Sequence, residues 1–162
     1  MFLLPENDPF LNIAVGDLDL NNLPSNFHET VNEMIDLMYK VNAIGLAAPQ
    51  VGLSWRMFVM HTTNGPKVCI NPEIYKVGDM KPTKEGCLSF PSLRLIIHRP
   101  NFIQAGYYDL LGDHRKEYFD GIEAVCFQHE LDHLDGITFD QRVSKFQYKN
   151  ALKKRKTRKA ID

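Results

Sequence analysis

Two histidines and a glutamate in the last third of the chain have the spacing of a metal site. They lie in the run His129-Glu130-Leu131-Asp132-His133, which is an HExxH pattern. Helical residues four apart share one face, so both imidazoles can bind one metal ion from the same side. Glu130 lies beside them and can accept a proton from a water that such a metal activates. The motif therefore favours a catalytic divalent metal over two ordinary surface histidines.

The two histidines alone leave a catalytic metal short of protein ligands. A divalent ion in a hydrolytic site takes three protein ligands and keeps a further position open for water. In one extended form of the motif a third histidine follows the second, but Phe139 stands at that position. Other HExxH proteases use a downstream glutamate, and no glutamate follows Glu130 in this chain. The third ligand must therefore come from upstream or be an aspartate.

Cysteine is the obvious candidate, and the chain has three. Cys126 lies one turn before His129, about 4.5 Å along a helix axis, which favours a small buried residue over a ligand. Cys69 lies in an apolar run typical of a packed strand. Cys87 lies in the segment 85–91, where glycine and proline indicate an unusual backbone path. Position alone favours Cys87 over Cys69.

Hydrophobic periodicity places the HExxH motif on a helix and predicts two further helices. Apolar residues recur at three- and four-residue steps from Phe27 to Val41. A second helix from Gly121 to Leu134 is followed by Gly136, a typical helix-ending residue, and a third begins after Ser144. Each has candidate capping residues at its start: Asn26 with Glu29, Asp120 with Glu123, and Ser144 with Gln147.

The pattern between the first two helices is that of β-strands. Asn64-Gly65 separates two of the runs and predicts a tight hairpin, and Gly112-Asp113 marks another turn. The predicted strands run from Trp55 to His61, Lys67 to Ile70, Leu93 to Ile97, Phe102 to Tyr108 and Lys116 to Phe119. Strands grouped between helices indicate an α+β fold. We expect mostly antiparallel sheets packed around a central HExxH helix, with an N-terminal helix and a C-terminal basic helix.

Composition is that of an ordinary globular domain. The chain has 162 residues, of which 44% are apolar and 24% charged, so a single core of normal size is expected. Three cysteines exclude a disulfide scaffold, and no apolar run is long enough for a transmembrane helix. The first ten residues lack the features of a signal or transit peptide. We therefore expect a cytoplasmic protein with no membrane contact. We also expect a monomer, although no sequence feature fixes the oligomeric state.

The net charge of −1 conceals an asymmetry. From Ser144 onward, eight basic residues face one acidic residue, which gives a net charge of +7. The preceding part has 11 basic and 19 acidic residues, a net charge of −8. We predict a catalytic domain over residues 1–143 and a basic helix or tail over 144–162. Such a tail indicates either a polyanionic partner or a solvated helix whose cations lie at its negative end.

Three motifs, in order, resemble peptide deformylase. They are the runs Gly45-Leu46-Ala47-Ala48-Pro49-Gln50-Val51-Gly52, Glu85-Gly86-Cys87-Leu88-Ser89 and Gln128-His129-Glu130-Leu131-Asp132-His133-Leu134. The resemblance implies that Cys87, His129 and His133 hold the metal. It also implies Fe(II) in the active form, whereas a cysteine and two histidines equally suit zinc, and nickel is a further possibility in purified protein.

The resemblance implies a substrate and a mechanism. The substrate is the N-formyl-methionyl end of a nascent polypeptide, and the products are formate and a free amino terminus. Glu130 would move the proton, while the Gln50 side chain and the Leu88 backbone N–H would bind the oxyanion. Gly45 would pair with the extended substrate.

Further residues match positions around the substrate in that family. The substrate-binding set that the resemblance implies is Ile44, Gly45, Gly86, Arg94, Ile122 and Cys126. Glu85 and Arg99 match an ion pair that braces the cysteine loop. By analogy with bacterial relatives, the basic tail would contact the ribosome. Two other functions remain open on the sequence alone: an HExxH endopeptidase, and a binding module in which the metal is structural.

Overall fold

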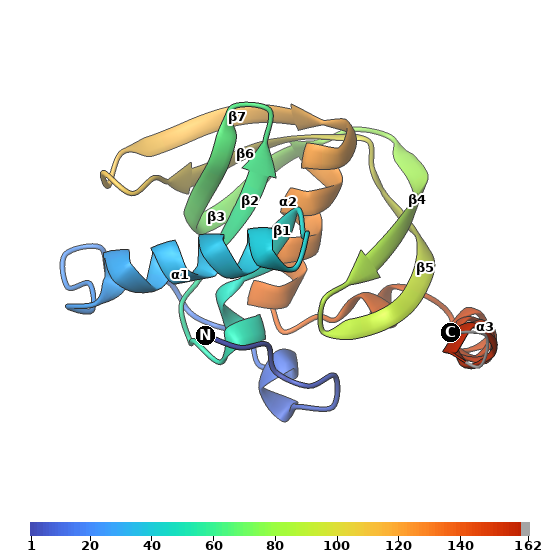
Figure 1. Cartoon of the computed structure of the whole chain (residues 1–162). Helices are drawn as coiled ribbons and strands as arrows, with labels where there is room; N and C mark the ends of the chain where they lie inside the picture. Colours follow the sequence, from blue (N-terminus) through green and yellow to red (C-terminus); the bar gives the residue numbers. More distant parts are fainter. Residues whose placement is uncertain (160–162) are drawn as a thin grey trace.

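The computed structural model describes residues 1–159, with side chains through residue 156 (Figure 1). The three helices are α1 (Phe27–Lys40), α2 (Gly121–Leu134) and α3 (Lys145–Lys159). Short 3-10 helices lie at η1 (Pro9–Asn12), η2 (Ala48–Val51) and η3 (Phe139–Arg142). The strands are β1 (Gly45–Ala47), β2 (Met57–Thr62), β3 (Gly65–Val77), β4 (Met80–Cys87), β5 (Phe90–Pro100), β6 (Phe102–Tyr108) and β7 (His114–Asp120). None of the helices described is long and apolar enough to cross a membrane.

The strands form two antiparallel sheets. One has five strands in the order β1-β2-β3-β6-β7, and the other is the β4-β5 pair. The hairpin predicted at Asn64-Gly65 is confirmed, because Thr62 and Gly65 close the β2-β3 ladder and Gly65 has a φ of 102°. The α+β class with antiparallel sheets is confirmed.

The side chains of strand β2 pack on both faces of the larger sheet. Met57 and Val59 pack with α1, whereas Phe58 and Met60 pack with α2. Successive side chains of a strand point to opposite faces, so a strand covered on both sides is apolar throughout. The sheet therefore lies between α1 and α2, and α2 also contacts β5 of the smaller sheet.

The chain leaves α2 in a conformation that requires glycine. Gly136 has a φ of 69°, and a β-carbon there would lie within 3.0 Å of the backbone of residues 12–14. The N–H of Val15 donates to the carbonyl of Leu134 over 2.9 Å, which fixes the N-terminal segment against the end of α2. Both contacts hold the helix that carries the HExxH motif in one position.

Two predicted helix caps are wrong. Neither Asn26 nor Asp120 makes a side-chain capping hydrogen bond. Asn26 has φ −96° and ψ 15°, outside the extended backbone of a normal cap, and Gly121 has a φ of 53°, which turns the first residue of α2 away from Asp120. The third cap is confirmed, since Ser144 and Gln147 exchange backbone-to-side-chain hydrogen bonds.

Strands β1 and β4 were not predicted, and β3 is longer than predicted. β1 has three residues, too few for an alternating pattern. β4 contains Pro82 and several charged side chains, which are tolerated because it belongs to a two-stranded sheet with open edges. The far half of β3 is largely exposed and contains Pro72. In β3, the hydrophobic pattern therefore found only the buried part of the strand.

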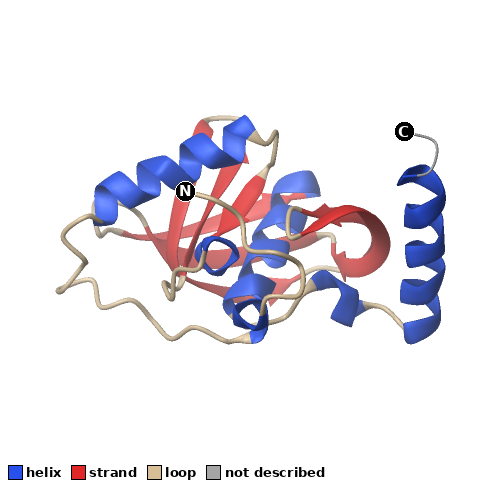
Figure 2. Ribbon diagram, turned by 60° about the horizontal axis from the view of Figure 1, so that its bottom comes forward, coloured by secondary structure: helices blue, strands red, loops and turns tan. Residues whose placement is uncertain are grey.

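Helix α3 packs on β5, on the side of the small sheet away from β2 (Figures 1 and 2). Tyr148, Ala151 and Leu152 of α3 cover a cluster that includes Leu93 and Leu95. The guanidinium of Arg155 pairs with Glu6 of the N-terminal segment over 2.6 Å. Residues 160–162 of the predicted basic tail, and the side chains of 157–159, lie outside the described part.

Candidate active site

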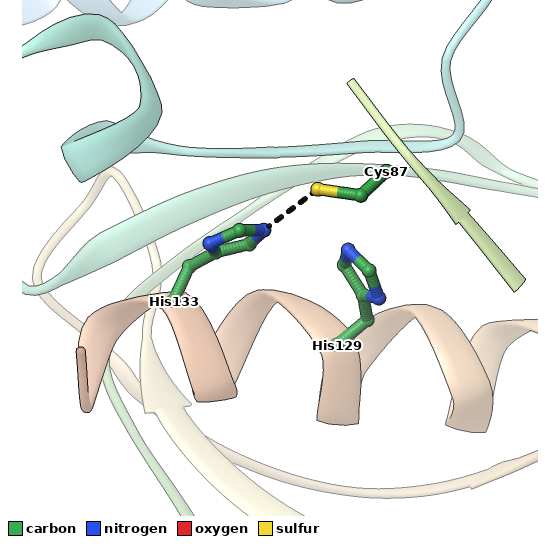
Figure 3. Close-up of side chains that lie close together, drawn as sticks. All are labelled: Cys87, His129 and His133. Atoms are coloured by element: carbon green, nitrogen blue, oxygen red, sulfur yellow. Dashed lines mark hydrogen bonds between the residues drawn. The ribbon is translucent and has the colours of Figure 1, made fainter. Parts of the chain in front are cut away.

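Helix α2 and the end of β4 bring three metal-binding side chains together. The ligand atoms of Cys87, His129 and His133 all lie within 4.8 Å of one another (Figure 3). All three residues are buried, and Sγ of Cys87 lies 3.3 Å from Nε2 of His133. The two histidines occupy adjacent turns of the same helix face, as their spacing predicts.

The donor set suits a divalent transition metal. A thiolate and two imidazoles are the ligands that zinc and ferrous iron accept in proteins, and three protein ligands leave a position open. Burial and the nearby charge of His129 hold the pKa of His133 well below its usual range, so this ring is neutral, which is the form that binds metal. No further Cys, His, Asp or Glu joins the group among the described side chains.

A carboxylate orients His129. Oε2 of Glu85 lies 2.9 Å from Nδ1 of the ring, so an ionised Glu85 accepts the Nδ1 proton and leaves Nε2 for a metal. Burial raises the pKa of Glu85, but hydrogen bonds from His129 and Arg99 outweigh it and lower that pKa to about 2. Burial lowers the pKa of His129, but hydrogen bonds to Cys87 and Glu85 raise it overall to about 10. A metal must therefore displace a proton from His129 when it binds.

Arg99 extends this arrangement behind the metal-binding group. Its guanidinium donates to both oxygens of Glu85, over 2.6 and 3.0 Å, and to Oδ2 of Asp132 over 2.9 Å. Asp132 also accepts hydrogen bonds from Arg142 of η3. The Glu85–Arg99 pair stood among the predicted site residues. The sequence reasoning missed Asp132 and Arg142, although Asp132 lies inside the HExxH motif itself.

Glu130 is buried and only partly paired. It is 4% exposed, and its Oε2 has no hydrogen-bond partner among the described atoms. Burial raises the pKa of Glu130 to about 7, against the opposing charges of His129 and Arg99. A carboxylate with this pKa can both take and return a proton near neutrality.

Gly45 allows the backbone of β1 to lie directly against Glu130. A β-carbon at this position would lie 2.4 Å from Oε1 of Glu130 and 2.6 Å from Sγ of Cys126. No real side chain fits at these distances, so glycine is the residue that this contact requires. The family resemblance implies substrate pairing for Gly45, whereas this steric role was not predicted from the sequence.

Gln50 reaches the group from η2. Its Oε1 accepts the backbone N–H of Ala47 over 2.9 Å, so its amide nitrogen must face the other way. That nitrogen donates to Oγ of Ser89 over 3.2 Å and lies 3.7 Å from Sγ of Cys87. Ser89 was missed as an orienting residue, although it stands within the cysteine motif.

A cavity of about 600 Å³ opens in front of these residues. Ile44 and Ile122 stand in its lining and are 45% and 65% exposed, so neither is a core residue. Cys126 lies between them, and its thiol donates to the Ile44 carbonyl over 3.2 Å. Other predicted residues that line the cavity are Gly45, Gln50, Glu85, Gly86, Cys87, Leu88, Arg94, His129 and Glu130.

Two predicted site residues lie outside that lining. His133 closes the metal-binding group from within α2, and Arg99 lies behind Glu85. Cys69, the weaker candidate ligand, is fully buried in the core cluster between β3 and α2. The structure therefore places the predicted site residues in the cavity lining, with His133 and Arg99 behind it, and leaves Cys69 out.

Comparison with known proteins places this arrangement in a family. The sequence model of the family described as Polypeptide deformylase matches residues 3–149. A peptide deformylase of Thermotoga petrophila is 43% identical over 120 residues, which cover 74% of this chain and 73% of the relative. One of Maricaulis maris is 35% identical over 167 residues, covering 99% and 95% of the two chains.

Solved structures agree in fold and sequence. A peptide deformylase of Synechococcus elongatus in complex with actinonin superposes with a TM-score of 0.88 at 35% identity, covering 95% of this chain and 85% of the other. A peptide deformylase of Thermotoga maritima gives a TM-score of 0.83 at 38% identity, with coverages of 88% and 97%. The matched family model spans both the metal-binding group and the cavity, and the chain belongs to the polypeptide deformylase family.

Proposed function

We propose that this chain hydrolyses the formamide bond of N-formyl-methionyl polypeptides and releases formate and a free amino terminus. It is a metal-dependent hydrolase by family. The observation that carries the proposal is the convergence of Cys87, His129 and His133 beside Glu130, at the inner end of a cavity with apolar walls.

Cys87, His129 and His133 would hold the metal. When bound, a divalent ion supplies Lewis acidity and lowers the pKa of a water molecule toward neutrality. We propose Fe(II) for the active enzyme, with zinc or nickel as alternative occupants that this donor set also accepts. The Glu85 carboxylate fixes the tautomer and orientation of His129 toward the ion.

Glu130 would act as the proton carrier. It accepts a proton from the attacking water and delivers it to the amine nitrogen when the carbon–nitrogen bond breaks. The water oxygen remains in formate, so one water is consumed in each turnover. The buried position of Glu130, with one unpaired oxygen, supports this assignment.

Gln50 and Leu88 would stabilise the oxyanion that forms on the formyl carbon. The Gln50 amide nitrogen is directed toward Cys87 because the Ala47 N–H holds the amide oxygen. Leu88 lies in the turn between β4 and β5, directly after Cys87, and would contribute its backbone N–H. Preorganised donors of this kind lower the barrier because they need no rearrangement during the reaction.

The cavity walls would select methionine and an extended chain. Ile44, Ile122 and Cys126 offer an apolar lining suited to an unbranched thioether. β1 is an edge strand that pairs with β2 alone in its sheet, so its free edge can pair with a substrate strand beside Gly45. Gly86 and Arg94 would contact the peptide beyond the methionine.

Formate release separates this function from the two alternatives. A formyl-Met-Ala-Ser peptide is incubated with enzyme loaded with Fe(II) under anaerobic conditions, and formate and free amine are measured. We expect equal amounts of both, without cleavage of the internal peptide bonds. Internal cleavage would indicate an endopeptidase, and full metal occupancy without formate would indicate a structural site.

The oligomeric state, the cellular location and the role of the basic segment are proposed as follows. We propose a monomeric cytoplasmic protein with a catalytic domain over residues 1–143. The basic segment 144–162 would contact the ribosome, because phosphate groups attract clustered lysine and arginine. Lys149 and Lys156 stand exposed on the described part of α3 and support this proposal.

A further inference from the structure

A second cavity lies between β5 and α3, next to the cavity in front of the metal-binding group. Its volume is about 380 Å³. In Figure 2, α3 stands beside the curled β4-β5 pair. Side chains from both line the cavity, which is called the cleft from here on. Lys84, Ser92 and Arg94 line both cavities, so the two are adjacent along this edge of the small sheet.

One wall of this cleft is the outward face of the β4-β5 pair. Lys84 and Ile96 are partners across the two strands, and Arg94 lies two residues before Ile96. Residues two apart on a strand share a face, so these three side chains lie together. Arg94 also extends across Gly86, because a β-carbon on Gly86 would lie 2.1 Å from a guanidinium nitrogen of Arg94. Arg94 therefore lies where the two cavities adjoin.

The opposite wall is one stripe of α3. Gln147, Asn150, Ala151 and Lys154 follow one another at helical spacing and line the cleft. Leu95, Val143 and Ala151 give the cleft an apolar component. An extended peptide backbone needs both features, polar side chains for its amides and apolar surface for its side chains.

The cleft is also strongly basic. Lys84, Arg94, Lys154 and Arg155 line it, and no acidic residue does so within the described part of the chain. Arg155 is paired with Glu6, whereas the other three cations have no ion-pair partner among the described residues. The rest of the molecule outside the tail carries a net charge of −8. A local group of unpaired cations beside an acidic domain therefore provides a local attraction for an anion.

We propose that this cleft is a binding subsite for the nascent chain beyond its methionine, and that it favours an acidic side chain there. The proposal rests on the proposed deformylase function, because it takes the substrate out of the first cavity past Arg94, which lines both cavities. It makes Lys84 and Lys154 determinants of substrate selectivity. A peptide is favoured over ribosomal RNA as the occupant because the cleft has a partly apolar lining and shares Lys84, Ser92 and Arg94 with the catalytic cavity.

The test compares paired peptides on the metal-loaded enzyme. The peptides begin with formyl-Met-Ala and extend to at least six residues. The two members of a pair differ only in having glutamate or glutamine at one position from the third to the sixth, and kcat/KM is measured by formate release. We expect a preference for glutamate of about threefold to tenfold at one or two adjacent positions, mainly through KM, and a weaker preference at high salt. The formyl-Met-Ala-Ser peptide has no acidic side chain and reports deformylation itself. Loss of deformylation is therefore distinguishable from loss of the preference for glutamate.

Matched variants assign the preference to the cleft. Lys84→Gln and Lys154→Gln should each lower the glutamate preference toward one. Lys156→Gln removes the same charge from the opposite face of α3 and should keep the preference of the parent enzyme. Equal kcat/KM for both peptides at every position overturns the proposal. A preference that Lys84→Gln and Lys154→Gln leave intact, or that Lys156→Gln reduces equally, overturns it too. A loss of ribosome binding in Lys154→Gln without any change in peptide preference would assign the cleft to RNA instead.

Discussion

Oε2 of Glu85 lies 2.9 Å from Nδ1 of His129, and the same carboxylate accepts two hydrogen bonds from Arg99. One side chain thus connects the strand that ends at Cys87 with the helix that carries both histidines. The relative position of the three metal-binding groups depends on this carboxylate staying ionised. Its pKa of about 2 keeps it so throughout the physiological range.

Glu85→Gln is expected to make the metal-free protein less stable and less sensitive to acid. Because the folded pKa of Glu85 is about 2 and its ordinary value is 4.5, its contribution is complete above about pH 4.5 and is lost as the pH falls toward 2. The contribution is up to about 3 kcal/mol in the free energy of unfolding. Urea unfolding of the metal-free protein at pH 7 and at pH 3 measures it.

The glutamine variant should also bind metal about 10- to 100-fold more weakly, because His129 loses its orienting acceptor. Glu29→Gln on the exposed face of α1 is the matched control and should change neither quantity. If the free energy of unfolding of Glu85→Gln has the same pH dependence as that of the parent, the pKa of Glu85 in the folded protein is not low.

Gly45→Ala is expected to lower kcat/KM by about 10²-fold, because the new β-carbon displaces the Glu130 carboxylate. The protein should remain folded, since the clash is with two side-chain ends and not with backbone. Gly16→Ala is the control, because no atom lies within 4 Å of a β-carbon there. Formate kinetics and thermal unfolding of both variants decide the matter, and an active Gly45→Ala enzyme would refute the steric role.

Cys87→Ser is expected to weaken metal binding at least about tenfold, since a hydroxyl does not replace a thiolate. Cys126→Ser should keep the metal, because a hydroxyl can still donate to the Ile44 carbonyl. Competition with a chelator, followed by metal analysis, compares the two proteins. Metal loss in Cys126→Ser and retention in Cys87→Ser would reverse the ligand assignment.

Lys149→Gln combined with Lys156→Gln is expected to reduce co-sedimentation with ribosomes at low salt while peptide deformylation is retained. These charges lie on the face of α3 away from the cleft. Charge substitution is preferable to deletion of the helix, because Tyr148 and Leu152 cover the β5 cluster and deletion would expose it. Unchanged co-sedimentation would leave α3 as a solvated helix.

The sequence predicted the three helices and the shared helix face of His129 and His133, because both rest on local signals. Most other candidate site residues came from the family resemblance. The periodicity of α1 and α2 and the HExxH spacing each involve residues only three or four positions apart. Cys87 entered the site through position and family resemblance, not through any pattern of its own. Its place beside His133 depends on the β4-β5 turn, which is a long-range feature.

The residues that the sequence missed are those whose role arises from contacts between distant segments. Ser89 orients Gln50 across 39 positions of sequence, and Asp132 joins Arg99 across 33. Glu85 and His129 were both predicted as site residues, but their contact across 44 positions was not. No periodicity or local motif encodes such pairings, so only the folded chain reveals them. The cleft beside α3 is of the same kind, since its walls come from β5 and the end of the chain.

Replacement of Glu130 by glutamine removes the group that would move the proton in a metal-dependent deformylation. The parent enzyme and Glu130→Gln are loaded to equal Fe(II) occupancy under anaerobic conditions, and formate release from formyl-Met-Ala-Ser is measured. The account predicts that Glu130→Gln retains the metal and loses about 10²- to 10⁴-fold in kcat. Comparable turnover by the two proteins at equal occupancy would contradict it.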